Sequence, residues 1–234
     1  MRKVCCVILE YCGGAQTDKL HKKLSAWNPS HTIYVLDNAS PHNTCSCITH
    51  RNEHNSGIGG GIRDALQLAR TTGADVLLLI VNDVVPVTKI DIGYYEELLN
   101  RFPDVVQVSA SITRNTAQAA NYPWMIDAGS RENRVVPHAD LLCCAIDIDF
   151  VENFGGFPPS RGGWGYDWEI AYHADLLKKK IVVCDFFKVK HIHPDTPKTG
   201  PQHEDKYEEL VRIYDAKYGS YRTIFVHEHI GDNT

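Results

Sequence analysis

The sequence predicts a single α/β domain with a mostly parallel central sheet flanked by helices, and two observations carry this prediction. Short apolar runs alternate with helix-length amphipathic segments through the first half of the chain, which is typical of consecutive β-α units. The 234 residues also contain no low-complexity segment and no stretch rich in Pro, Gly and Ser, so nothing divides the chain.

In the first half, strands are expected at apolar runs and helices where apolar residues recur at helical spacing. In chain order these are strand Val4–Tyr11, helix Thr17–Ala26, strand Thr32–Leu36, a weak strand Cys45–Thr49, helix Gly59–Thr71, strand Asp75–Val81 and helix Ile90–Arg101. The almost unbroken Val, Leu and Ile after Asp75 indicate a strand that is buried on both faces.

The second half is less regular. Its expected elements are strand Val105–Ser111, strand Ala139–Ile148, a helical turn at Asp149–Phe154, helix Trp168–Lys179, strand Ile181–Val189 and a terminal helix at His203–Tyr218. Between them, Asn115–Pro137 has scattered polar residues with Pro, Trp and Gly, which favours a hairpin or a mobile loop.

Charge and apolar run length exclude two kinds of partner. The net charge is −5, whereas a nucleic-acid surface needs clustered Lys and Arg, so no nucleic acid is expected. The longest apolar runs are too short to cross a bilayer, so no transmembrane segment is expected.

The eight cysteines are expected to be free thiols. Cys5 and Cys6, like Cys143 and Cys144, are neighbours within strands, where adjacent side chains point to opposite faces. The Cys45-x-Cys47 pair has no second pair at zinc-ligand spacing, which disfavours zinc. Free thiols indicate a reducing compartment, and we expect a cytoplasmic protein.

Polar side chains follow two of the expected strands. Asp37 ends the second strand, and Asn82 and Asp83 follow the buried strand. Ligands of open α/β sheets collect outside the carboxyl ends of the strands, so Asp37 and Asp83 should share one crevice. Asp83 and the Asn82 amide oxygen are suitable ligands for a hard divalent cation. His193, at the exit of another strand, could add an imidazole ligand, although the pattern separates it only weakly from His191.

A glycine cluster at Gly57–Gly61 opens a helix and could bring backbone N–H groups to a phosphate, with Arg63 one turn later. It matches neither the dinucleotide fingerprint nor the GxxxxGK[ST] phosphate loop, so neither of those folds is expected.

The segment Gly162–Ile170 places two carboxylates, Asp167 and Glu169, among aromatic rings. A carboxylate in such surroundings can have a raised pKa, which suits a general base that acts on a hydroxyl. Trp164 and Trp168 could stack on a sugar ring, and Trp164 is the one expected to be exposed. The pattern leaves the choice between the two acids open.

In order, these segments resemble the family-2 glycosyltransferases, which have the GT-A fold. The resemblance rests on YVLDNAS, NSGIGGGIRDAL, LLLIVNDVVP, FGGFPPSRGGWGYDWEIAYHA and KVKHIH, and covers roughly residues 4–193. The metal-binding DxD of the family is here VND, which leaves Asp83 as its only carboxylate.

The resemblance implies a role for each candidate residue. Asp37 would contact the nucleotide base, Asn55, Gly57, Arg63 and Asn82 would lie on the donor side, Asp83 and His193 would bind the metal, Asp167 would be the catalytic base with Glu169 as the alternative, and Trp164 would bind the acceptor. Residues 1–115 would form the donor half, 116–200 the acceptor and catalytic half, and 201–234 a helix and tail.

The implied activity is transfer of a sugar, with inversion and with Mn²⁺ or Mg²⁺, from a UDP- or dTDP-sugar to a hydroxyl of a carbohydrate acceptor. Two other classes stay open. A sugar-nucleotide nucleotidyltransferase usually has a basic glycine-rich loop after its first strand, and Cys12-Gly13-Gly14-Ala15 has no basic residue. The reduced DxD would also suit a non-catalytic domain that binds a carbohydrate or nucleotide.

Overall fold

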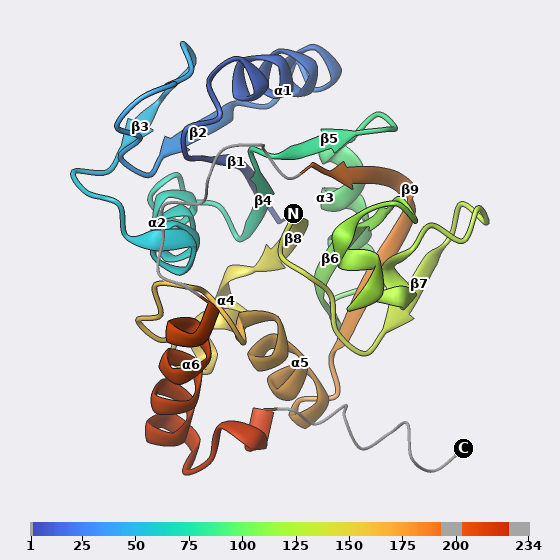
Figure 1. Cartoon of the computed structure of the whole chain (residues 1–234). Helices are drawn as coiled ribbons and strands as arrows, with labels where there is room; N and C mark the ends of the chain where they lie inside the picture. The colour runs from blue at the N-terminus through green and yellow to red at the C-terminus, as the bar shows by residue number, and fades with distance from the viewer. Residues whose placement is uncertain (1, 193–202, 225–234) are drawn as a thin grey trace.

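Within residues 2–192 and 203–224, which this computed structural model describes, the chain folds around one nine-stranded sheet (Figure 1). The strand order is β3-β2-β1-β4-β8-β6-β9-β5, and β7 pairs with β9 outside this path. The predicted α/β fold with one central sheet is therefore confirmed. The sheet is mixed and not mostly parallel as predicted, because four of its eight strand pairings are parallel and four are antiparallel.

The elements follow the sequence closely. The strands are β1 (Val4–Glu10), β2 (Ile33–Asp37), β3 (His50–Arg51), β4 (Val76–Val81), β5 (Val84–Pro86), β6 (Val105–Ile112), β7 (Asn133–Val136), β8 (Cys143–Asp147) and β9 (Lys180–His191). The helices are α1 (Gly14–Trp27), α2 (Gly57–Thr71), α3 (Ile92–Arg101), α4 (Ile148–Asn153), α5 (Tyr166–Leu176) and α6 (His203–Tyr218), with 3₁₀ turns η1 (Ala117–Ala120), η2 (Pro123–Met125) and η3 (Tyr221–Ile224).

Parallel pairing is concentrated in the first four strands, β3, β2, β1 and β4, and recurs between β6 and β9. Strand β8 is antiparallel to both of its neighbours, β4 and β6, while β5 and β7 are antiparallel to β9. Because β8 runs against β4, the residues that precede β8 lie beyond the carboxyl end of β4, where ligands of such sheets collect.

Both faces of the central sheet are covered. Val7 and Ile8 are neighbours in β1 and point to opposite faces, yet neither is exposed. All six residues of β4 are buried as well, as its Val, Leu and Ile composition predicts. Helix α6 runs beside α4 and α5 at the lower edge of Figure 1. A smaller apolar cluster lies under this helix and consists of Leu210, Ile213, Tyr214 and Ile224.

Several local predictions differ from the structure. Strand β8 begins at Cys143, four residues later than expected, α1 begins at Gly14, three residues earlier, and β5 was not predicted. Cys45–Thr49 is not a strand, because this stretch turns back toward α1 and the pairing with β2 is made by the two residues of β3. Strand β7, whose four residues give little periodic signal, lies within Asn115–Pro137 and makes an antiparallel pair with β9. Helix α5 begins at Tyr166, two residues earlier than expected, so Asp167 lies inside its first turn.

The eight cysteines are free, and the adjacent pairs in β1 and β8 are buried, as predicted. No helix in the described ranges is long and apolar enough to cross a membrane.

Candidate functional site

Three strand ends meet beyond the carboxyl end of β4. Asn82 and Asp83 form the tight turn between β4 and β5. The pairing of Val84 with His191 brings the end of β9 to this turn, and the antiparallel start of β8 brings Asp140 to the same edge. Residues that are far apart in the sequence thus converge at one end of the sheet.

Asp83 and His191 are in direct contact, with 2.9 Å between Asp83 Oδ2 and His191 Nε2. The Ile192 N–H also donates to the Asp83 carbonyl at 2.9 Å, so the backbone holds the two segments together. His193, the other candidate ligand, lies outside the described residues. A carboxylate and an imidazole side by side are a donor set that suits a divalent cation.

Asp140 was not among the residues singled out from the sequence. The pKa of its carboxyl is raised to about 6, mainly by burial; the Leu141 N–H and His191 lower it, and the charge of Asp83 raises it. These effects place Asp140 within electrostatic reach of the Asp83–His191 pair. A second carboxylate near the pair fits a cation, although the one described group of three such ligand atoms within 4.8 Å lies elsewhere, at α1.

Asp167 lies in the first turn of α5, two residues after Gly165, the N-cap of the helix. Gly165 has φ +86°, and a Cβ there would lie 2.7 Å from the Tyr214 ring. Both the backbone conformation and the lack of space therefore require glycine. The Tyr122 hydroxyl donates to Asp167 Oδ2 at 2.9 Å. The pKa of Asp167 is raised to about 7, because burial and the charge of Asp140 raise it by more than the Tyr122 hydrogen bond lowers it.

Glu169 lies in a different environment. It is fully buried and forms an ion pair with Lys217 of α6 at 2.5 Å. The hydroxyls of Tyr218 and Tyr214 donate to its two carboxylate oxygens at 2.5 and 3.3 Å. Burial raises the pKa of Glu169 while Lys217 and the tyrosines lower it. This acid therefore fastens α6 to α5 and is surrounded by protein groups.

Trp164 and Trp168 differ in exposure, as expected. Trp164 precedes α5 in the loop and is 44% exposed. Trp168 is half-buried, lies 4.9 Å from the His138 ring centroid, and packs against the cluster under α6. Only Trp164 is exposed enough to offer a ring face to a ligand.

Asp37 ends β2, as predicted, with a fully buried carboxylate. Its Oδ1 accepts hydrogen bonds from the Ser40 N–H at 3.1 Å and the Ser40 hydroxyl at 2.5 Å. Its Oδ2 is 2.9 Å from Nη1 of Arg51, whose side chain is 48% exposed. Arg51 therefore lies between this carboxylate and the solvent.

The glycine cluster of α2 packs against the loop before α5. A Cβ at Gly57 would lie 2.2 Å from the Arg161 carbonyl oxygen, and one at Gly59 would lie 2.3 Å from that of Ser160. Asn55 supports this turn, because its Oδ1 accepts the Gly57 N–H at 2.8 Å. The cluster thus permits a close approach of protein backbone, where the sequence had indicated a phosphate.

Arg63 is the second link between α2 and the same loop. Its Nη1 donates to the carbonyls of Pro158 and Ser160 at 2.9 and 3.0 Å and contacts the Tyr166 hydroxyl at 2.7 Å. This guanidinium joins the predicted donor half to the start of α5, so its position affects both.

Asn82 is tied to β1 by a residue that sequence reasoning missed. Its Nδ2 donates to Glu10 Oε2 at 2.8 Å, and Glu10 Oε1 accepts the N–H groups of Gly13 and Gly14 at 2.5 and 3.2 Å. The fully buried Glu10 therefore shapes the turn between β1 and α1 around the amide of Asn82. The only sequence signal for this role was an acid at the end of an apolar strand.

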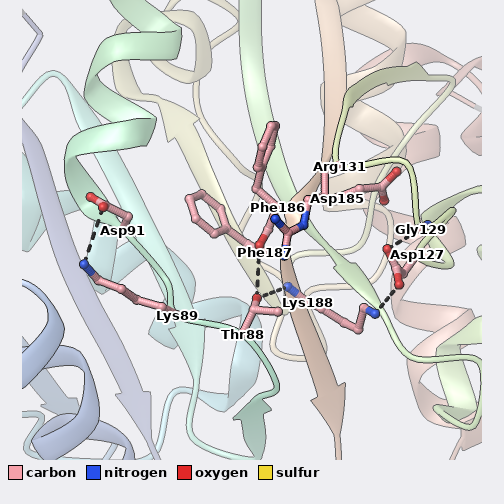
Figure 2. Close-up of a pocket in the computed structure, with 10 residues that line it drawn as sticks. All are labelled: Thr88, Lys89, Asp91, Asp127, Gly129, Arg131, Asp185, Phe186, Phe187 and Lys188. Carbon is pink, nitrogen blue, oxygen red and sulfur yellow. Dashed lines mark hydrogen bonds and ion pairs between the residues drawn. The ribbon is translucent and has the colours of Figure 1, made fainter.

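A hollow of about 460 Å³ lies along the edge where β5 meets β9, and Figure 2 shows its lining. It is lined by Thr88, Lys89, Asp91, Asp127, Gly129, Arg131, Asp185, Phe186, Phe187 and Lys188. Three cationic and three acidic side chains balance in charge, and Lys188 pairs with Asp127 while Lys89 pairs with Asp91. A hollow without excess positive charge is a poor site for a diphosphate.

Comparisons with known proteins identify the fold. No protein-family model and no curated protein matches the sequence. The structure of GalNAc-T7 with UDP, GalNAc and Mn²⁺ is similar with a TM-score of 0.68 and 14% identity, over 95% of this chain and 49% of that one. S. aureus TarS in complex with UDP-GlcNAc is similar with a TM-score of 0.61 and 14% identity, over 90% and 65%. A197 from STIV has a TM-score of 0.50 and 17% identity, over 83% and 87%.

The chain therefore has the GT-A fold, which it shares with the glycosyltransferases GalNAc-T7 and TarS. At these identities the likeness is one of fold. The chain spans about half the length of the GalNAc-T7 chain that it matches.

Proposed function

We propose that this chain is an inverting glycosyltransferase that moves a sugar from a UDP- or dTDP-sugar to a hydroxyl of a carbohydrate acceptor. One observation carries the proposal: Asp140 precedes β8 at the carboxyl end of β4, its charge raises the pKa of Asp167, and the charge of Asp83 raises the pKa of Asp140. This supports one shared site for the candidate ion ligand and the candidate base. The donor class is supported by the UDP and UDP-GlcNAc of the two similar structures.

Asp167 is the proposed catalytic base. It would accept the proton of the acceptor hydroxyl as the oxygen attacks the anomeric carbon from the face opposite the leaving nucleotide, which inverts the configuration. A pKa of about 7 keeps a basic carboxylate partly ionised at neutral pH. Glu169, the alternative, is enclosed by Lys217 and two tyrosines, which supports a positioning role for it.

Asp83 is the proposed ligand of a divalent cation, Mn²⁺ or Mg²⁺, together with a histidine. His191 is already at 2.9 Å from Asp83, and we favour it over His193 as the imidazole ligand. A bound cation would offset the negative charge that gathers on the departing nucleotide diphosphate. With two protein ligands in contact, the oxygens of the donor diphosphate would have to complete the coordination.

The remaining donor-side residues are proposed to act together. Asp37 would accept the N3–H of uracil or thymine, an exchange in which Arg51 has to swing out toward solvent. The packing contact between α2 and the loop before α5 would be held by Asn55, Gly57 and Arg63. Asn82 would keep the β4–β5 turn in register with β1 through Glu10.

The acceptor side is proposed to begin at Trp164, whose exposed ring could stack on a sugar next to Asp167. Cytoplasmic localisation stays a prediction from the free cysteines.

The test is release of UDP from UDP-sugars, assayed with Mn²⁺ and a panel of sugar acceptors. We expect slow release by the wild type without acceptor and faster release with a suitable one. Asp167→Asn should reduce turnover at least 100-fold while UDP binding, measured by calorimetry, stays within twofold, because a transition-state interaction is lost. The matched control is Asp175→Asn, an exposed acid on the same helix, which should retain activity.

Other outcomes would redirect the assignment. If Glu169→Gln abolishes turnover and Asp167→Asn does not, Asp167 is not the base. Pyrophosphate exchange without UDP release indicates a nucleotidyltransferase, and binding of UDP without any turnover indicates a binding domain. Asp83→Ala should weaken Mn²⁺-dependent UDP binding at least tenfold, and unchanged calorimetry would remove Asp83 from the ion site.

A further inference from the structure

A second group of metal-ligating side chains lies on the other side of β2, where α1 contacts the connection between β2 and β3. It consists of Asp18 from α1 and of Cys45 and Cys47 from the turn that the sequence had suggested to be a strand. One ligand atom from each residue lies within 4.8 Å of the other two. Cys45 is buried, while Asp18 and Cys47 are half-buried, so an ion can reach the group from outside.

The backbone arranges this group without help from an ion. The Ser46 N–H and hydroxyl both donate to Asp18 Oδ1, at 2.8 and 2.9 Å, so the turn wraps around the carboxylate. Three residues further back toward β2, the Asn43 amide donates to the Cys12 carbonyl at 2.7 Å and fixes the same connection to the start of α1. The three ligands are therefore held on two segments that are already fastened together.

The chemistry of the three ligands selects the kind of ion. Two thiolates and one carboxylate favour a thiophilic divalent cation of the Zn²⁺ class over Mg²⁺, which prefers oxygen. Zn–S bonds of about 2.3 Å in a tetrahedron place two sulfurs about 3.8 Å apart. The observed ligand atoms already lie within 4.8 Å of one another, so the two sulfurs need to approach by about 1 Å at most.

We propose that Asp18, Cys45 and Cys47 bind one Zn²⁺-class ion, with water in the fourth position. The spacing Cys-x-Cys alone does not predict such a site, because the third ligand comes from a helix that is distant in the sequence. Binding converts two thiols to thiolates and releases two protons for each ion. The ion would hold the connection that follows Asp37 against α1, and it is separate from the Asp83–His191 site.

The experiment uses Co²⁺ as a spectroscopic probe for Zn²⁺, added to the full chain after it is stripped with chelator and kept reduced. We expect one equivalent of Co²⁺ to produce a thiolate charge-transfer band in the near ultraviolet, which Zn²⁺ abolishes and Mg²⁺ does not. Cys45→Ser and Cys47→Ser should each lose the band, and Asp18→Asn should weaken Co²⁺ binding at least tenfold. Cys12→Ser, a half-buried cysteine near the group, is the matched control and should keep it.

A second measurement uses the wild type alone, so it does not depend on whether a variant folds. Zn²⁺ should slow alkylation of Cys45 and Cys47 in the wild type at least tenfold and leave the rate at Cys12 unchanged, as read by mass spectrometry. Absence of a thiolate band in the wild type, or Zn²⁺ that leaves the alkylation of Cys45 and Cys47 unchanged, overturns the proposal. Neither result bears on sugar transfer, which is tested separately.

Discussion

The Tyr122 hydroxyl donates a hydrogen bond of 2.9 Å to Oδ2 of Asp167. Tyr122 comes from the irregular segment before β7, and Asp167 comes from the first turn of α5. A donor that faces a carboxylate stabilises its ionised form, so this contact opposes the effect of burial on the pKa of Asp167.

This relationship predicts how activity depends on pH. A general base works only when ionised, so transfer should rise with pH and reach half of its plateau near the Asp167 pKa of about 7. Tyr122→Phe removes the donor, and the rise should move to higher pH by about one unit. The measurement is kcat/KM for UDP release from pH 5 to 9, and a rise that stays in place in Tyr122→Phe would contradict the assignment.

Asp140 should shift the same profile in the opposite direction. Its negative charge raises the pKa of Asp167, so Asp140→Asn should move the rise in activity to lower pH. Because Asp140 also lies near the Asp83–His191 pair, metal must be kept saturating so that only the base is observed. A profile that moves to higher pH would show that Asp140 acts on Asp167 by another route.

Much of the fold was predictable from local pattern. The apolar run of β4 is unambiguous because all six residues face protein on both sides of the sheet, and α6 matches its expected bounds. Asp83 could also be placed at a ligand-binding edge, since that rule needs only the direction of one parallel strand.

The positions of Asp140 and Glu169 could not be predicted from local sequence pattern. Asp140 reaches the site because β8 is antiparallel to β4, and strand direction is a property of the whole chain path. Glu169 pairs with Lys217 of α6, and local periodicity predicts that helix but not where it packs. Asp167 and Glu169 are two residues apart, and only tertiary contacts separate their surroundings.

Removal of the Asp167 charge should stabilise the fold. Its pKa is raised in the folded state, so the contribution of Asp167 to stability is greatest below the unfolded pKa of about 4 and is lost as pH rises through 7. Asp167→Asn should therefore raise the melting temperature at pH 8, with the gain shrinking toward pH 5. Thermal unfolding at both values tests this, and a lower melting temperature at pH 8 would show that the hydrogen bond from Tyr122 outweighs the cost of burying the charge.

Removal of the Lys217 charge should destabilise the fold. Lys217 is the cation that pairs with the fully buried Glu169, so Lys217→Met leaves a buried carboxylate without its charge partner and should cost about 2 kcal/mol or more. Because Lys217 lowers the pKa of Glu169, the loss should be larger at pH 8 than at pH 5. Lys178→Met removes an exposed ion pair on the nearby surface and should change the free energy of unfolding by about 0.5 kcal/mol or less. Equal losses in urea denaturation would show that the burial of Glu169 is not what matters.

Gly59 provides a test of how α2 meets the loop before α5. In Gly59→Ala the new Cβ would lie 2.3 Å from the Ser160 carbonyl oxygen and 2.7 Å from the Gly163 nitrogen, and backbone atoms cannot rotate away as a side chain can. The loop must shift, and the variant should lose about 2 kcal/mol, in the range of overpacked positions. Gly93→Ala in α3 is the control, because its Cβ would meet only the Asp91 side chain at 3.3 Å and alanine favours the helix by about 0.5–1 kcal/mol.

If the close approach also positions Asp167, Gly59→Ala should lower transfer more than its stability loss explains, because Arg63 and Tyr166 join the same loop to α5. Urea denaturation and UDP release measured on the same preparations separate the two effects, and a Gly59→Ala variant as stable as Gly93→Ala would refute the packing argument.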